Sequence, residues 1–109
     1  MPTRPDTLQG SLPLLVLTIL ARRGPLHGYG ITAHIQRLSE HLRVEEGSLY
    51  PALHRMEEAR WIKARQVTTE HGRRARAYEI TAEGRRRLGV EEERWRLTTG
   101  AVNHVLKHA

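Results

Sequence analysis

Residues 48–80 read SLYPALHRMEEARWIKARQVTTEHGRRARAYEI, and the spacing of the apolar residues changes within this stretch. In its first third, apolar side chains recur at helical spacing, at Leu49, Leu53 and Met56. After Arg60, apolar and polar residues alternate over 61–67 and again over 75–80, with the turn signal His71-Gly72 between them. The stretch therefore predicts a helix followed by a β-hairpin.

The residues before this stretch predict two further helices. Ser11 is the expected N-cap of an apolar helix that ends at Arg22-Arg23-Gly24, with Pro13 in its first turn, where a missing N–H does no harm. A turn over 24–28 leads to a second helix over 28–38, and a connection over 39–47 follows it. Because the first helix is apolar almost all round, a second subunit is a natural cover for its outer face.

The third helix has two possible starts. If Ser48 is its N-cap, the helix runs to about Ala59 and Pro51 falls in the first turn, where its missing donor is harmless. An earlier start makes Pro51 lose a hydrogen bond, so the later start is favoured.

One long helix is predicted after the hairpin, with Thr81 as N-cap and an end near Lys107. Leu88, Trp95 and Val102 lie seven residues apart along it. The order of three helices, two strands and a helix is that of a winged helix-turn-helix with an added C-terminal helix, mainly α with a small β-hairpin. Residues 1–10 are expected to form a flexible arm, 11–80 the winged helix-turn-helix and 81–109 the C-terminal helix.

Composition and charge favour a nucleic-acid partner. Eighteen Lys and Arg against twelve Asp and Glu give a net charge of +6 over 109 residues. The absence of cysteine excludes disulfides, thiolate metal sites and cysteine catalysis. No apolar run is long enough to span a membrane, and the N-terminus lacks a signal-peptide pattern, so a cytoplasmic protein is expected.

The third helix and the hairpin carry the residues suited to DNA. Opposite the apolar stripe of the helix lie polar or small groups, namely Ser48, Tyr50, Pro51, His54 and Arg55. His54 or Arg55 could hydrogen-bond a guanine edge in the major groove. The tip and return strand of the hairpin carry Arg73, Arg74 and Arg76, a pattern typical of contact with phosphates. The alternative is that the helix face is only solvated and that Tyr50 packs into the core.

Four motifs in chain order resemble those of PadR-type transcriptional regulators, in the compact branch with a single C-terminal helix. They are Leu26-His27-Gly28-Tyr29-Gly30-Ile31, the segment 46–57, Gly72-Arg73-Arg74-Ala75-Arg76-Ala77-Tyr78, and the exit segment 78–84. The resemblance covers roughly residues 8–90, most of the chain. It implies a homodimeric winged-helix repressor. Because the third helices of two such subunits should lie about one DNA turn apart, a pseudo-palindromic operator in double-stranded DNA is expected.

The resemblance also implies roles for single residues. Ser48, Tyr50, Pro51 and His54 fall on the side that faces DNA, Tyr29 contacts a phosphate, and Gly72, Arg73 and Arg74 form the wing. The first and last helices form the dimer interface, to which we assign Leu15, Leu88, Trp95 and Val102. Glu91-Glu92-Glu93 and Gly100 depart from the family's pattern in the last helix.

Trp95 has two interpretations. It is a hydrophobic anchor of the dimer or, as the resemblance implies for some compact members, one of two paired tryptophans that hold a planar aromatic effector. Trp61, at the start of the first strand, is expected in the core.

Other classes of function have less support. His104 and His108 have a zinc-compatible spacing but no evident third ligand, so neither a metal nor another cofactor is expected. Glu57-Glu58 and Glu91-Glu92-Glu93 are interpreted as solvated faces, and no catalytic constellation is present, so the chain is not expected to be an enzyme. The alternative function is a winged-helix module that binds proteins and not DNA.

Overall fold

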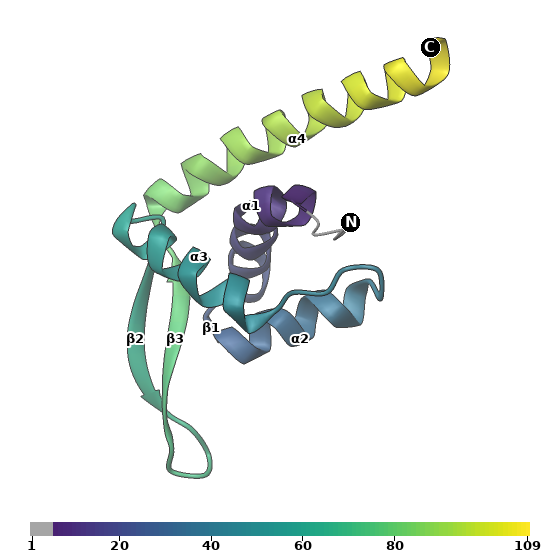
Figure 1. Ribbon diagram of the computed structural model, residues 1–109. Helices are drawn as coiled ribbons and strands as arrows, with labels where there is room; N and C mark the ends of the chain where they lie inside the picture. Colours follow the sequence, from purple (N-terminus) through teal and green to yellow (C-terminus); the bar gives the residue numbers. More distant parts are fainter. Residues whose placement is uncertain (1–5) are drawn as a thin grey trace.

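The computed structural model describes residues 6–109 as a winged helix with one long C-terminal helix (Figure 1). The elements in chain order are α1 (Asp6–Arg23), β1 (Leu26–His27), α2 (Gly28–Leu38), α3 (Glu46–Glu58), β2 (Ile62–Thr68), β3 (Arg74–Ile80) and α4 (Ala82–His108). The predicted bounds of the second helix are confirmed, and those of the hairpin and the last helix hold to within a residue or so.

The core lies where α1, α2 and α3 meet the root of the hairpin. Its most deeply buried side chains are Val16, Leu17, Leu20, Ile31, Leu49, Leu53, Met56 and Ile62. Every apolar position of the predicted α3 stripe is therefore buried, which fixes the opposite face of α3 toward solvent. Within the described part of the chain, no helix is long and apolar enough to cross a membrane.

The sheet has three antiparallel strands in the order β1-β3-β2. The short β1 pairs only with the inner end of β3, Leu26 opposite Tyr78 and His27 opposite Ala77. From Arg76 outward, β3 pairs with β2 alone, Arg76 lying opposite Gln66 and Arg74 opposite Thr68. The outer part of the hairpin is thus a two-stranded ribbon that projects from the body of the domain as the wing (Figure 1).

The first turn of α4 is fastened to the start of β2. The Thr81 hydroxyl caps α4 by accepting from the Gly84 N–H at 2.9 Å, and it also donates to the carbonyl of Arg60 at 2.6 Å. Gly84 packs so closely that a Cβ there would lie 2.0 Å from the carbonyl oxygen of Trp61. Beyond this anchor, α4 passes over α1 and extends past the rest of the molecule (Figure 1).

Three predicted features of α1 and of the segment that follows it are wrong. Helix α1 begins at Asp6, so residues 6–10 are helical instead of a flexible arm, and Pro13 lies in the helix interior instead of the first turn. Residues 1–5 of the predicted arm lie outside the described residues. The segment 24–28, predicted as a turn, contains β1, because its pairing with β3 is a long-range contact that no local pattern reports.

Helix α3 begins at Glu46, before the predicted N-cap Ser48. The extended residue Glu45 closes the first turn, since its carbonyl accepts from the N–H groups of Ser48 and Leu49, both at 2.9 Å. Pro51 therefore lies inside the helix and leaves the carbonyl of the exposed Gly47 without an intrahelical donor. Because Gly47 faces solvent, water can satisfy that carbonyl, which lowers the cost of the earlier start.

Candidate nucleic-acid interface

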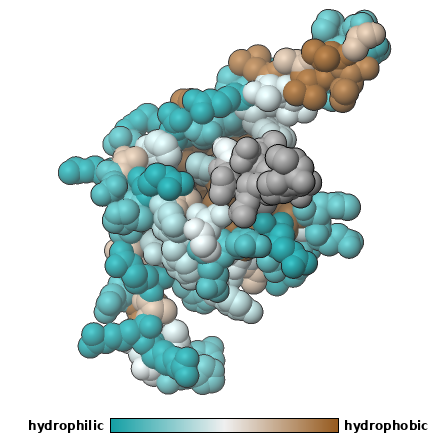
Figure 2. Space-filling view, in the orientation of Figure 1, coloured by the Kyte–Doolittle hydropathy of each residue, from teal (hydrophilic) through white to brown (hydrophobic). Residues whose placement is uncertain are grey.

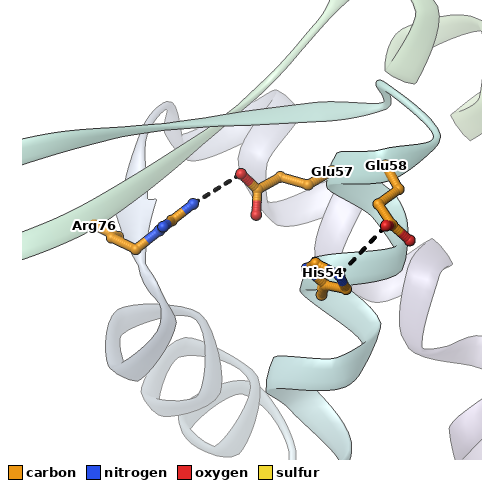
Figure 3. A network of polar contacts seen from close by, with 4 residues as sticks. All are labelled: His54, Glu57, Glu58 and Arg76. Carbon is orange, nitrogen blue, oxygen red and sulfur yellow. Dashed lines mark hydrogen bonds and ion pairs between the residues drawn. The ribbon is translucent and has the colours of Figure 1, made fainter.

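The outer face of α3 presents the residues that the sequence assigned to DNA. Tyr50, Pro51, His54 and Arg55 are exposed, and Ser48 is half-buried. The His54 Nε2 atom lies 3.4 Å from an Oε2 oxygen of Glu58, one turn further along the helix (Figure 3). This face thus carries hydrogen-bond donors and acceptors on a rigid element, as base-edge readout requires.

The wing presents basic side chains next to α3. Gly72 has φ +76°, a conformation that favours glycine, and its N–H donates to the carbonyl of Thr69 at 3.0 Å. The Thr69 hydroxyl accepts from the Arg73 N–H at 3.1 Å, so the turn is held by its own hydrogen bonds. Arg73 and Arg74 are exposed, and within residues 6–109 neither forms an ion pair. Hydrophilic side chains cover most of the wing (Figure 2).

A groove runs between the start of α2, the outer face of α3 and the wing. Aromatic and basic side chains line it, namely His27, Tyr29, Tyr50, Tyr78, Arg73, Arg74 and Arg76. Tyr29 is 70% exposed and stacks on the ring of His27 with centroids 6.3 Å apart. Phenolic hydroxyls and guanidinium groups in one concave surface suit a strand of phosphates.

Tyr50 fits into the groove because Gly28, whose packing role no sequence pattern indicates, leaves room for its ring. The ring lies against Gly28, where a Cβ would come within 2.7 Å of the Tyr50 hydroxyl. Tyr78 forms the inner wall, and burial raises the pKa of its hydroxyl, which stays protonated as a donor. The alternative that Tyr50 is a core residue does not apply, since 44% of its surface is exposed.

Arg76 differs from the other wing arginines because it has a partner on α3. Its Nη2 atom donates to Oε2 of Glu57 at 2.8 Å, and its guanidinium lies 6.0 Å from the centre of the Tyr78 ring (Figure 3). Glu57, interpreted from the sequence as part of a solvated face, is half-buried in this contact. No sequence pattern indicates this pair, because its members lie 19 residues apart on different elements.

The residues assigned to the dimer interface divide into two groups. Leu15 and Leu88 are half-buried and pack against the core. Trp95 and Val102 lie further out on α4 and are 45% and 51% exposed. Trp95 lines a cavity of about 180 Å³ together with Leu14 of α1 and Glu91, Arg94 and Thr98 of α4.

Glu91 is buried, contrary to its interpretation as a solvated acid. Its Oε2 atom accepts from Arg87 Nη2 at 2.6 Å, and the same guanidinium lies 4.8 Å from the centre of the Trp61 ring. Trp61 is half-buried at the edge of the core, as expected. The network joins the cavity beside Trp95 to the start of β2.

Comparison with known proteins identifies relatives that match most of the chain, including α3 and the wing. The family model described as the transcriptional regulator PadR-like family matches residues 16–90. A transcriptional regulator from Clostridium thermocellum is 30% identical, with a TM-score of 0.82 over 91% of this chain and 96% of that one. A PadR-like transcriptional regulator from Bacillus cereus is 26% identical, with a TM-score of 0.79 over 95% of this chain and 99% of that one.

One curated protein is also similar. The chain is 40% identical over 89 residues to an uncharacterized 37.1 kDa protein of transposon TN4556 from Streptomyces fradiae. These residues are 82% of this chain but 24% of that protein, so the chain spans about a quarter of the length of that relative. Both of these solved structures are of transcriptional regulators. Since the family model covers well over half of the sequence and the winged-helix geometry agrees with it, this chain belongs to the PadR-like family of transcriptional regulators.

Proposed function

We propose that two copies of this chain bind one pseudo-palindromic operator and repress transcription until a small molecule binds between them. Each subunit places the outer face of α3 in a major groove and its wing along the flanking backbone. The observation that carries the proposal is the exposed polar face of α3 beside Arg73 and Arg74 of the wing, which are exposed and form no ion pair within residues 6–109. Tyr29 and Tyr50 line the groove between them, where a phosphate strand can pass.

The charged groups of the wing and of α3 contribute differently to DNA affinity and to sequence specificity. Arg73 and Arg74 supply attraction to phosphates that does not depend on sequence. His54 and Arg55 face the base edges and supply discrimination between sequences. Ser48 and Pro51, at the same face, allow the helix to approach the backbone closely.

The apolar outer half of α4 supports a dimer. Three large apolar side chains, Trp95, Val102 and Leu106, are exposed on one side of it, with Val105 about 60° from Val102. Val90 and Leu97 are also exposed but lie on the opposite side of α4. Apolar surface gathers at the free end of this helix (Figure 2). An exposed apolar stripe of this length marks an interaction surface, and an equivalent stripe on a second copy is its natural cover.

The cavity beside Trp95 supports regulation by a planar aromatic compound. A ligand stacked on Trp95 would also contact the α4 segment that carries Glu91, and α4 is fastened to β2 through Gly84. A shift of α4 would change the angle between the two winged helices and so their fit to the operator. Trp95 fluorescence in a Trp61→Phe background should respond to such compounds. No response to a broad panel of planar aromatics would leave a regulator without this effector.

Binding to duplex DNA over a range of salt concentrations tests the function. We expect the wild-type protein to bind, with log affinity falling steeply against log salt. Because each lost phosphate contact changes the slope by about 0.9, Arg73→Gln with Arg74→Gln should reduce it by roughly 3–4 per dimer. A protein that binds no duplex at low salt and elutes early from heparin would instead be an interaction module.

A further inference from the structure

The Glu57–Arg76 ion pair lies at the place where the wing leaves the body of the domain. Arg76 is the first residue of β3 beyond the pairing with β1, so from this position outward the wing has only β2 as its neighbour. Glu57 lies in the last turn of α3, and its carboxylate reaches across to Arg76 (Figure 3). The pair therefore connects the two elements that must meet DNA together.

We propose that Glu57 is a positioning residue for DNA binding, which sets the angle between α3 and the wing by holding Arg76. The proposal rests on the DNA-binding function proposed above. It gives Arg76 a role different from the phosphate contact that its place in the wing predicted.

The geometry around Arg76 favours an anchor. The guanidinium is held on one side by the Glu57 carboxylate at 2.8 Å and lies over the Tyr78 ring at 6.0 Å. Tyr78 is itself buried and packs against the core, so the arginine is tied to a fixed wall. Arg74, two residues away on the same face of β3, has no ion pair within the described residues. Arg76 also lines the groove and is exposed, but its guanidinium already has an acidic partner, whereas Arg74 has none within the described residues.

A small change at the root of the wing has a large effect at its tip. At about 3.3 Å per residue, the turn over 69–73 lies roughly 10–15 Å beyond Arg76, and a tilt of about 10° moves it by roughly 2–3 Å. Over such a displacement the guanidinium groups of Arg73 and Arg74 stay beside the phosphates and still displace their counterions, but their hydrogen bonds lengthen and weaken, so the affinity falls while the salt slope does not. Loss of the pair should therefore weaken operator binding even though Glu57 is an acid near a polyanion.

The direction in which neutralising Glu57 changes DNA affinity distinguishes a positioning role from simple repulsion of phosphates. If Glu57 only repels phosphates, its neutralisation strengthens binding and frees Arg76 to contact the backbone. If Glu57 positions the wing, the same change weakens binding. The variant Glu57→Gln, measured on a duplex recovered by selection with the wild-type protein, is expected to bind about 5–10 times more weakly with an unchanged salt slope.

Arg76→Gln and Arg74→Gln form a matched pair on one strand. Arg74→Gln should reduce the salt slope by roughly 2 per dimer, because each subunit loses a phosphate contact. Arg76→Gln should weaken binding without that change in slope. The charge swap Glu57→Arg with Arg76→Glu should restore affinity to within about threefold of wild type, and thermal melting monitored by circular dichroism verifies that each variant is folded.

These experiments distinguish failure of the positioning role of Glu57 from failure of the proposed DNA-binding function. If the wild-type protein binds no duplex, the DNA-binding function fails and the positioning role with it. If the wild type binds but Glu57→Gln binds as well or better, or Arg76→Gln lowers the slope as much as Arg74→Gln, the positioning role alone is overturned. A charge swap that stays as weak as Arg76→Gln also contradicts it.

Discussion

Gly84 is the residue on which the attachment of α4 depends. A Cβ at this position would lie 2.0 Å from the Trp61 carbonyl oxygen, a backbone atom that cannot move without displacing β2. Gly84→Ala is therefore expected to lower the free energy of unfolding by about 2–4 kcal/mol. Chemical denaturation at fixed protein concentration measures this change.

Gly89→Ala, five residues along the same helix, is the control. A Cβ there meets nothing within 4 Å, and the position is exposed. The higher helix propensity of alanine should raise stability by up to about 1 kcal/mol. If both variants are equally stable, the close contact at Gly84 does not hold α4 in place.

His34 makes stability depend on pH. Partial burial lowers the pKa of its ring from the usual 6.5, and the guanidinium groups of Arg23 and Arg37 lower it further. Between the folded and unfolded pKa values the unfolded chain binds more protons, so the contribution of this residue is present above about 6.5 and is lost as pH falls. His34→Gln should show a smaller loss of unfolding free energy than wild type between pH ~7.5 and pH ~5.5.

The variant Arg37→Gln tests whether the lowered pKa of His34 causes the loss of stability in acid. Removing one guanidinium raises the folded pKa of His34 only part of the way, because burial is the larger effect. Its acid sensitivity should fall between those of wild type and His34→Gln. An acid response identical in all three proteins would show that His34 does not govern it.

Substitutions in α3 and in the wing should have different effects on DNA binding, because α3 supplies base contacts and the wing supplies phosphate contacts. His54 and Arg55 are exposed on the outer face of α3, whereas Arg73 and Arg74 lie on the wing. Arg55→Ala should reduce affinity for the selected operator by about 10-fold or more while leaving random duplex nearly unchanged, since one good base contact contributes about 1–3 kcal/mol of discrimination. Competition titrations with the two duplexes measure the ratio. Equal losses on both would place Arg55 on the backbone.

The elements that the sequence predicts well are those determined by their own residues. The helix over 28–38 and the alternating strands of the hairpin have periodic apolar faces, and they form where that spacing predicts. The errors concern contacts between distant residues. β1 exists only because Leu26 and His27 pair with β3, and helical packing keeps Pro13 and Pro51 inside helices that local rules would shorten.

In the candidate site, too, local features could be predicted from the sequence, whereas contacts between distant residues could not. Exposure of Tyr50, His54 and Arg55 could be predicted, because the opposite face of α3 is so clearly apolar. The partners of charged side chains could not, since Arg76 and Glu57 are on separate elements and Glu91 is buried against α1 and Arg87. Charge runs indicate how many ionic groups a face carries but not which of them are paired.

The molecule is elongated, with principal extents of 57 × 32 × 22 Å, and α4 projects from its body. A charge placed in its apolar stripe should break the proposed dimer. Val102→Glu is expected to give a monomer by analytical ultracentrifugation, whereas Asn103→Glu, about 100° around the helix, should remain dimeric. If Val102→Glu keeps the wild-type mass, the two copies do not meet through this stripe.

The proposed dimer also determines how DNA is read. Two α3 helices related by a two-fold axis should contact half-sites about one turn of DNA apart, roughly 34–36 Å, in successive major grooves on one side of the duplex. The most direct test of this arrangement is selection of bound sequences from a random duplex pool with the wild-type protein. We predict an enriched inverted repeat with half-site centres about 10 base pairs apart. Recovery of no common sequence, or of a single unrepeated site, would contradict a symmetric regulator that reads DNA through α3.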